Sequence, residues 1–366
     1  MKVLLISDSY PPWHKGGPDV VAKNLHRALS KKINVTLLTE APKRINDENV
    51  IFIKSYKNLV LNAINSAIRR HILLRELKKY DIIHFEVLPG FKNFLIPKIS
   101  KKYGKKIVIT LHGSPLREIN LHRSYFRRFC SMINYAFFLN NIKNIDNIIV
   151  NSNWIKKIIQ DDLKKKSVMI PNGVNLERNE SNKKIKLEGA QNILFWGRIS
   201  PEKGVDLLIH SAKFVLEKNP MCHFYIIGDG PELKSIKKLS ENLGIQKNIH
   251  YTGFLSYEEI VKYANSADIT VFPSKFENSP ISILEAMSIG KPIVSTDIGG
   301  IPEIVNNYEN GLLAKLDSKN ISEKLIILLK DKELRNKLSK NAFKTAKKFS
   351  WDIIAKNYIE YYEKIK

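Results

Sequence analysis

The sequence predicts an α/β protein with two domains, each built around a parallel β-sheet. Short apolar segments alternate with longer amphipathic ones, as expected for parallel strands covered by helices on both faces. This alternation forms two series along the chain, separated by a polar stretch. The 366 residues exceed the usual length of one domain, and a hydrophobic content of 43% is sufficient for two cores.

Each series contains five predicted strands. Those of the first series lie at residues 3–7, 34–39, 81–85, 106–111 and 147–151. A polar connection, NGVNLERNESNKKIKLEGA at residues 172–190, follows without a clear apolar period. The strands of the second series lie at residues 192–196, 222–227, 249–252, 268–272 and 292–296. Ligands of such sheets bind beyond the carboxyl ends of the strands, so we expect the loops after these strands to carry the chemistry.

Residues 273–305, which follow the fourth strand of the second series, are the most informative part of the chain. They read PSKFENSPISILEAMSIGKPIVSTDIGGIPEIV. Ser279 suits an N-cap and Pro280 suits the first helical position, so a helix is predicted to begin at Pro280. Glu277 then lies in the loop. Glu285 reaches back toward the helix start, because helical side chains tilt toward the N-terminus.

This arrangement suits a ligand that has both a phosphate and hydroxyl groups. The N–H groups and the positive end of a helix N-terminus bind phosphate. Ionised carboxylates accept hydrogen bonds from hydroxyls such as those of a ribose or a hexose. Glu277 and Glu285 therefore indicate a sugar nucleotide.

The two glutamates and the string EAMSIGKPIVSTDIGGIPEIV resemble the donor site of retaining GT-B glycosyltransferases of family four. The resemblance implies two Rossmann-like domains facing across a cleft, with a C-terminal helix crossing back to the first. We expect an acceptor-side domain at residues 1–166 with 351–366, and a donor domain at residues 167–350. It also implies that a hexose-type sugar moves from a UDP or GDP sugar to an acceptor hydroxyl with retention of configuration.

The loop after the first strand of the second series, WGRISPEKG, contains Arg198 and Lys203. Both can neutralise a diphosphate whose negative charge grows as the sugar bond breaks, and both match phosphate-binding cations of the family. The alternative is two surface cations in a basic protein. By the same resemblance, Glu277 holds donor-sugar hydroxyls and Glu285 holds the ribose. The other donor-binding residues implied at this helix start are Asn278, Ser279, Pro280 and Ile281.

Four further loop residues match the family and also have ordinary structural explanations. Gly16 and Gly17 follow the first strand and are expected near the donor phosphates and the acceptor, although paired glycines also form simple turns. Gly228 and Phe254 follow two later strands and are expected beside the base of the nucleotide. Turns and core packing explain these two residues adequately as well.

His112 ends the fourth strand and matches a family histidine that lies against the donor sugar. Gly113 departs from the acidic residue that often follows it, and a structural histidine is the alternative. The family is described as reacting through a front-face ion pair, in which the leaving phosphate helps to deprotonate the acceptor. The sequence has no Asp-x-Asp motif. We therefore expect no metal and no cofactor, with fixed cations neutralising the diphosphate.

The positive charge is concentrated in the first half of the chain. Residues 1–165 contain 30 Lys and Arg against 12 Asp and Glu, a net charge of +18, which leaves +6 of the total of +24 for the rest. Such asymmetry suits an anionic membrane surface or a nucleic acid, but solvated helix faces are a serious alternative. No nucleic-acid-binding motif is evident, so we expect no nucleic acid as partner.

Two segments mix basic and aromatic residues, as interfacial helices do. They lie at residues 117–143 and 54–80, and packing inside the first domain would explain their aromatics equally well. A lipid-linked or saccharide acceptor is the expected partner besides the nucleotide sugar. With two cysteines far apart, no signal peptide and no span of roughly 20 apolar residues, we expect a cytoplasmic protein with peripheral contact to the inner face of the membrane.

Three alternatives remain open at this level. A sugar-nucleotide epimerase or hydrolase on the same architecture would turn over the donor without an acceptor. A nucleic-acid-binding protein would use the basic first half of the chain. A catalytically silent sugar-binding module is less favoured, because the glutamates and the cations are all present.

Overall fold

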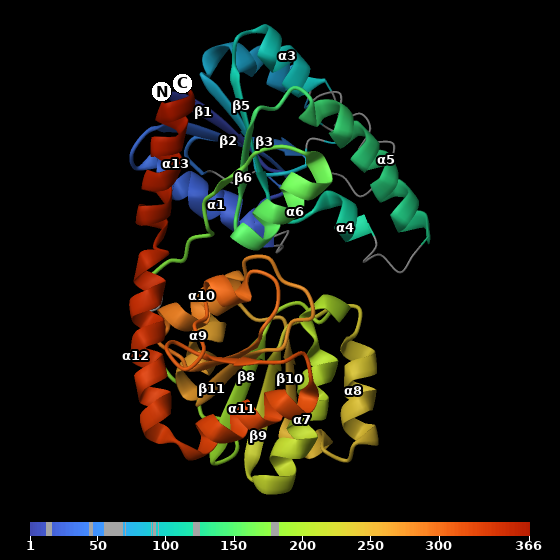
Figure 1. The fold of residues 1–366 in the computed structure, drawn as a ribbon, viewed down its shortest axis with the longest axis vertical. Coiled ribbons are helices and arrows are strands. Elements are labelled where there is room, and N and C mark those ends of the chain that lie inside the picture. Colours follow the sequence, from blue (N-terminus) through green and yellow to red (C-terminus); the bar gives the residue numbers. More distant parts are fainter. Residues whose placement is uncertain are drawn as a thin grey trace. The chain divides into compact units, whose positions relative to one another are not determined.

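The computed structural model of the protein describes residues 1–11, 17–43, 47–54, 69, 71–88, 90, 93, 95–119, 125–176 and 183–366. The chain divides into two compact units. Unit 1 consists of Met1–Gly173 and Trp351–Lys366, and unit 2 consists of Val174–Ser350. In each unit a central sheet has helices on both sides, as the alternating sequence pattern predicts (Figure 1).

Within the described residues, unit 1 contains a seven-stranded sheet in the order β3-β2-β1-β4-β5-β6-β7. All neighbouring pairs are parallel. The strands are β1 (Lys2–Ile6), β2 (Asn34–Ala41), β3 (Val50–Lys54), β4 (Ile82–Phe85), β5 (Lys106–Leu111), β6 (Asn147–Val150) and β7 (Val168–Met169). The helices are α1 (Gly17–Ser30), α3 (Ile96–Lys102), α4 (Pro115–Ile119), α5 (Tyr125–Ile142), α6 (Asn153–Leu163) and α13 (Trp351–Ile365).

The described part of unit 2 contains a six-stranded parallel sheet in the order β10-β9-β8-β11-β12-β13. The strands are β8 (Gln191–Trp196), β9 (Cys222–Ile227), β10 (Ile249–Gly253), β11 (Ile269–Phe272), β12 (Ile293–Thr296) and β13 (Leu312–Ala314). The helices are α7 (Val205–Lys218), α8 (Leu233–Asn242), α9 (Tyr257–Ser266), α10 (Ile281–Ser288), α11 (Ser318–Lys330) and α12 (Lys332–Lys348). A short 3-10 helix, η4 (Pro201–Lys203), precedes α7.

Both sheets have the strand order of a doubly wound Rossmann fold. The first three strands of each unit extend in one direction from the centre, and the next strands extend in the other. The order therefore reverses between β1 and β4 in unit 1 and between β8 and β11 in unit 2. Loops that leave the carboxyl ends on either side of such a reversal diverge, and ligands bind in the space between them.

The central strands are apolar on both faces because helices cover both sides of each sheet. In β1 every residue after Lys2 is buried, and in β11 all four residues are buried. The two hydrophobic cores lie in separate units. Each unit therefore has its own rigid support for the loops at its carboxyl edge.

The C-terminal helix α13 belongs to unit 1, although it follows unit 2 in the sequence. One face of the helix is buried, which reflects its apolar and aromatic residues at helical spacing. These buried residues are Trp351, Ile354, Ala355, Tyr358 and Tyr362. The helix packs against α1, the helix after the first strand.

The structure adds three strands to those expected and moves the boundary between the two domains. The strands β3, β7 and β13 were not predicted, and β7 and β13 are only two and three residues long, too short for an alternating pattern. The expected break between residues 166 and 167 lies instead between Gly173 and Val174. The reason is that β7 still pairs with β6 and extends the sheet of unit 1 beyond residue 166.

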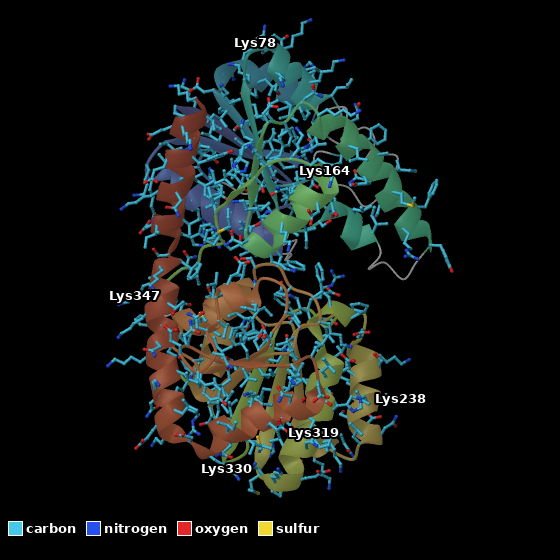
Figure 2. The ribbon with its side chains drawn as sticks, in the orientation of Figure 1. Lys78, Lys164, Lys238, Lys319, Lys330 and Lys347 are labelled. Atoms are coloured by element: carbon cyan, nitrogen blue, oxygen red, sulfur yellow. The ribbon has the colours of Figure 1, made fainter. Side chains whose placement is uncertain are left out.

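Exposed lysines lie on both units, and such exposure suits a solvated helix face and an anionic partner alike. The six lysines labelled in Figure 2 are all exposed. They are Lys78, Lys164, Lys238, Lys319, Lys330 and Lys347. Among the described helices, none combines the length and the apolar character needed to cross a membrane.

Candidate functional site

Two loops of unit 2 meet at the point where the strand order reverses. One follows β8 and contains the WGRISPEKG motif, and the other follows β11 and leads into α10. The backbone N–H groups of Lys275 and Phe276 both donate to the Glu202 carbonyl, at 2.8 and 3.2 Å. Two motifs that are far apart in the sequence are therefore neighbours in the structure, as expected for loops that flank a reversal of strand order.

Glycines allow these loops to approach each other as bare backbone. Gly204 has a φ of 65°, and a Cβ there would lie 2.0 Å from the carbonyl oxygen of Pro273. Gly228 has a φ of 139°, and a Cβ there would lie 1.9 Å from the carbonyl oxygen of Gly197. The described contacts of Gly228 thus concern the packing of the β8 and β9 loops, whereas a contact with a base stays a prediction.

One of the two loop cations, Lys203, contacts the loop acid Glu277. The Lys203 ammonium, at the end of η4, lies 2.5 Å from a carboxylate oxygen of Glu277, and their side chains are 26% and 13% exposed. Arg198, in the same loop as Lys203, is exposed and pairs with no carboxylate in the described part of the chain. An ammonium has three N–H donors, so Lys203 can hold Glu277 and a phosphate oxygen at the same time.

Helix α10 begins one residue later than the sequence predicts. Pro280 has an extended backbone, with φ −72° and ψ 111°, and occupies the N-cap position without a side-chain cap. Ser279 is therefore not the cap, and the first helical residue is Ile281. The backbone N–H groups of the first turn have no acceptor within the helix. They lie directly after the loop that carries Glu277, which suits an anion.

Glu285 lies on the second turn of α10 and accepts a hydrogen bond from the indole of Trp196 at 3.1 Å. Burial raises the pKa of the Glu285 carboxyl to about 7, although the Trp196 hydrogen bond lowers it somewhat. Near neutral pH the group is therefore divided between its two protonation states. Hydroxyl donors of a ligand would favour the carboxylate.

Trp196 is a part of the site to which the sequence assigned no role. It is the last residue of β8, it is only 4% exposed, and its ring packs edge-on against Phe272 at the end of β11, with centroids 4.9 Å apart. The indole thus connects the two strands at the reversal to the acid of α10. The only feature of the sequence that could have indicated this role is the position of a tryptophan at the carboxyl end of a central strand.

The remaining predicted residues lie in several places. Gly16 lies outside the described residues, and Gly17 is the exposed first residue of α1. His112 follows β5 in unit 1 and lies 2.9 Å from Glu86. Phe254 follows β10 and is 54% exposed. Asn278, beside Glu277 in the loop, is buried.

A group of possible metal ligands lies at the other edge of the sheet. Among the described residues, Glu188, His223 and His250 have ligand atoms within 4.8 Å of one another. Two nitrogens bound to one zinc ion lie about 3.3 Å apart, whereas Nδ1 of His223 and Nε2 of His250 are 2.7 Å apart, a hydrogen-bond distance. The histidines are near the amino ends of β9 and β10, whereas the loops after β8 and β11 leave the carboxyl ends of their strands.

Two Rossmann-type units with a terminal helix returned to the first define the GT-B class of glycosyltransferases. A solved structure of Anabaena HepE with UDP-glucose covers 100% of both chains with a TM-score of 0.78 at 19% identity. The sucrose-phosphate synthase of Thermosynechococcus elongatus has a TM-score of 0.78 at 19% identity, covering 100% of this chain and 98% of that one. At these identities the likeness concerns the fold.

The sequence comparisons specify the family. Residues 15–178 match the family model Glycosyltransferase Family 4, and residues 177–345 match Glycosyl transferases group 1. The uncharacterized glycosyltransferase MJ1178 of Methanocaldococcus jannaschii is 31% identical over 100% of this chain and 99% of its own length. An N,N'-diacetylbacillosaminyl-diphospho-undecaprenol alpha-1,3-N-acetylgalactosaminyltransferase of Campylobacter jejuni is 30% identical over 85% of this chain and 79% of its own. The chain belongs to glycosyltransferase family 4.

The raised pKa of Glu285 predicts a pH-dependent stability effect. The folded state holds this proton more tightly than the unfolded chain, so the stability contributed by Glu285 falls as the pH rises from about 4.5 through 7. A glutamine at this position would mimic the protonated form. We expect Glu285→Gln to raise the free energy of unfolding at pH 8, by up to about 3 kcal/mol, and to change it little below pH 4.5.

Urea unfolding at both pH values measures this difference. The matched control is Glu217→Gln, on the exposed face of α7, which should change stability at neither pH. Equal stability of wild type and Glu285→Gln at pH 8 would show that the carboxyl is not penalised by burial.

Proposed function

We propose that the protein transfers a hexose-type sugar from a nucleoside-diphosphate sugar to an acceptor hydroxyl with retention of configuration. The observation that carries the proposal is the contact between Lys203 and Glu277 beside the start of α10. A cation and a helix N-terminus suit the diphosphate, and the adjacent carboxylate suits the sugar. Membership of glycosyltransferase family 4 supports the reaction type.

In this proposal the diphosphate lies between the β8 loop and the start of α10. The bond between the sugar carbon and the phosphate oxygen breaks, so negative charge accumulates on the leaving diphosphate. Arg198, Lys203 and the N–H groups of the first turn of α10 stabilise that charge. Because the Lys203 ammonium is held by Glu277 and the N–H groups belong to the backbone of α10, these donors need little rearrangement when the bond breaks.

The two glutamates bind different hydroxyl groups of the donor. Glu277 accepts hydrogen bonds from the sugar while it holds Lys203, and Glu285 accepts hydrogen bonds from the ribose. With a pKa of about 7, Glu285 loses a fraction of a proton when a ribose binds at neutral pH. The nucleotide should therefore bind more tightly above pH 7 than below it.

The acceptor step needs neither a protein nucleophile nor a cofactor. The acceptor oxygen forms the new bond to the sugar carbon on the face from which the phosphate departs. The acceptor proton passes to a phosphate oxygen of the leaving group, so atoms and charges balance. His112 lies against the donor sugar in this proposal, and the fixed cations take the place of a divalent ion.

We further propose that α5 docks on an anionic membrane that holds a lipid-linked acceptor. Its exposed apolar residues Tyr125, Phe129, Met132 and Ile133 are spaced as one helical face and are 87%, 62%, 59% and 43% exposed. Phe138 on the same helix is buried, so packing explains that aromatic residue, whereas the exposed residues support the proposed interfacial role. The relative in Campylobacter jejuni is named for a diphospho-undecaprenol, which supports a lipid-linked acceptor. Arg123 and residues 55–68 of the second candidate segment lie outside the described residues.

Turnover of a panel of UDP and GDP sugars with lipid-linked and saccharide acceptors tests the reaction. Lys203→Ala removes one donor to the leaving group and should lower kcat by about 100-fold or more. Lys238→Ala, on the exposed surface of α8, is the matched control and should retain wild-type turnover.

Product analysis separates the proposal from an epimerase or hydrolase. Transfer requires that the sugar appears on the acceptor with its anomeric configuration kept. Equal donor consumption with and without acceptor would contradict the proposal, as would full activity of Lys203→Ala.

Vesicle co-sedimentation tests the membrane face of α5. The wild type should bind vesicles that contain anionic lipid, and Phe129→Asp should reduce the bound fraction several-fold, because it places a charge in the apolar stripe. Phe214→Asp, on an exposed surface of α7 in unit 2, should bind as the wild type does. Absence of wild-type binding, or equal loss in both variants, would exclude α5 as the membrane contact.

A further inference from the structure

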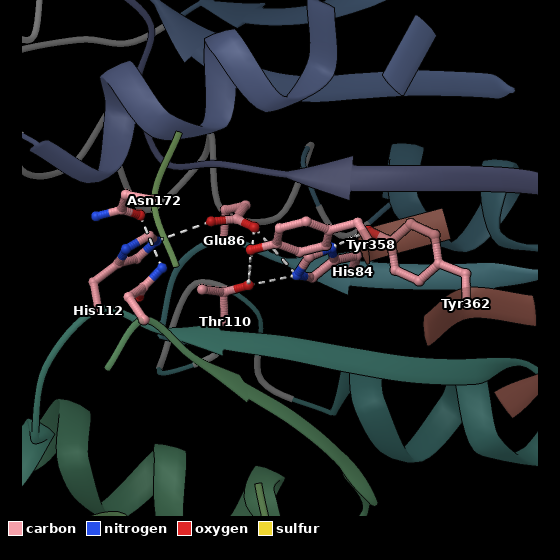
Figure 3. A network of polar contacts seen from close by, with 8 residues as sticks. His84, Glu86, Thr110, His112, Asn172, Tyr358 and Tyr362 are labelled. Atoms are coloured by element: carbon pink, nitrogen blue, oxygen red, sulfur yellow. Dashed lines mark hydrogen bonds and ion pairs between the residues drawn. The ribbon is translucent and has the colours of Figure 1, made fainter. Parts of the chain in front are cut away.

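Unit 1 contains a buried polar network that includes His112 (Figure 3). Glu86, one residue after β4, lies at its centre and has a side chain with 0% exposure. One carboxylate oxygen of Glu86 accepts from the Thr110 hydroxyl at 2.9 Å, and the other lies 2.9 Å from Nε2 of His112. His84 Nε2 lies 3.2 Å from the first of these oxygens.

Glu86 is an ionised acceptor. Burial raises its pKa, but the imidazoles of His84 and His112 and the Thr110 hydroxyl outweigh burial and hold the pKa below its ordinary value. An ionised carboxylate can only accept hydrogen bonds. Nε2 of His112 must therefore carry the hydrogen that lies between the two groups.

The charge of Glu86 also sets the direction of the bonds behind it. Because the Thr110 hydroxyl donates to Glu86, its oxygen accepts from Nε2 of His84 at 2.8 Å. Burial lowers the pKa of His84 to about 4, so this ring is neutral and its Nδ1 accepts from the Tyr362 hydroxyl at 2.5 Å. The donors run from Tyr362 on α13 through His84 and Thr110 to Glu86.

The partners of Glu86 indicate what the carboxylate does. In the described part of unit 1, no Lys or Arg pairs with it, and a buried carboxylate without a cation is costly. Its hydrogen-bond donors are neutral groups and the imidazole of His112. The His112 side chain is 17% exposed, whereas Glu86 is fully covered, so of these two groups His112 is the one that can contact a ligand.

We infer that Glu86 is a positioning residue for His112. It holds the imidazole in the Nε2–H tautomer and fixes the plane of the ring at the end of β5. The inference rests on the proposed function, in which His112 lies against the donor sugar. The bonds from Tyr362, His84 and Thr110 keep the carboxylate itself in place.

The variant Glu86→Gln tests the inference, because an amide keeps the shape of the carboxyl but removes its charge and can donate as well as accept. Nitrogen NMR of the histidine rings reports the tautomer directly. The wild type should show His112 as the Nε2–H form, and Glu86→Gln should shift the ring toward the Nδ1–H form. The matched control is Glu76→Gln, a buried glutamate of the same unit that pairs with Lys79 and Arg75.

A double-mutant cycle tests the consequence for turnover. We expect Glu86→Gln to lower kcat by about 10-fold or more, to shift its pH profile, and to change KM for the donor less. In the His112→Ala background the same change should have no further effect, since it acts through His112. Glu76→Gln should leave kcat and the pH profile unchanged.

Two results would overturn the inference: an unchanged His112 tautomer in Glu86→Gln, or an equal loss of kcat in both backgrounds, which would indicate a structural role only. If the proposed function itself is wrong, the results would be different. In that case Lys203→Ala and His112→Ala would both retain wild-type turnover, while the tautomer measurement would still decide whether Glu86 sets the state of His112.

Discussion

The pairing of Lys203 with Glu277 at the reversal of strand order in unit 2 is the interaction on which the rest of the site depends. It exists because β8 and β11 are neighbours in the sheet, although β9 and β10 lie between them in the sequence. The loops after these strands share backbone hydrogen bonds through Glu202, and Gly204 lets them touch without side chains. The ion pair is thereby held beside the first turn of α10, where negative charge on a ligand is best stabilised.

Each unit holds an acid near the carboxyl edge of its sheet, and the loss of solvent around these groups costs stability: Glu86 is fully buried and Glu285 is partly buried. Glu285 is neutralised in part by burial, whereas Glu86 stays ionised because hydroxyl and imidazole donors surround it. The difference follows from the donors: in the described residues the indole of Trp196 donates to Glu285, whereas Thr110 and two histidines surround Glu86. A carboxylate with few hydrogen-bond donors from the protein can accept hydrogen bonds from a ligand. A carboxylate with many such donors is suited to hold a neighbouring side chain in one orientation.

Much of the fold and of the candidate site could be predicted from the sequence. The features that could not be predicted have physical reasons. Ten of the thirteen described strands, the family and the two glutamates followed from apolar runs and one long motif. The strands β7 and β13 are too short for a pattern, and the start of α10 moved by one residue because Pro280 is extended. The bond from Trp196 to Glu285 and the bonds around Glu86 join segments far apart in the chain, which no local pattern encodes. The helix α5 has a buried aromatic residue, Phe138, and an exposed one, Phe129. Its composition alone therefore could not distinguish an interfacial helix from a helix packed inside the first domain.

The most direct test of the central claim is calorimetric. The affinities of the nucleoside diphosphate and the corresponding monophosphate should be measured for the wild type and for Lys203→Ala. If the loop cation holds the terminal phosphate, the wild type should bind the diphosphate at least about 10-fold more tightly than the monophosphate, and Lys203→Ala should lose most of that preference. An unchanged preference in Lys203→Ala would contradict the account, because the terminal phosphate would then be bound elsewhere.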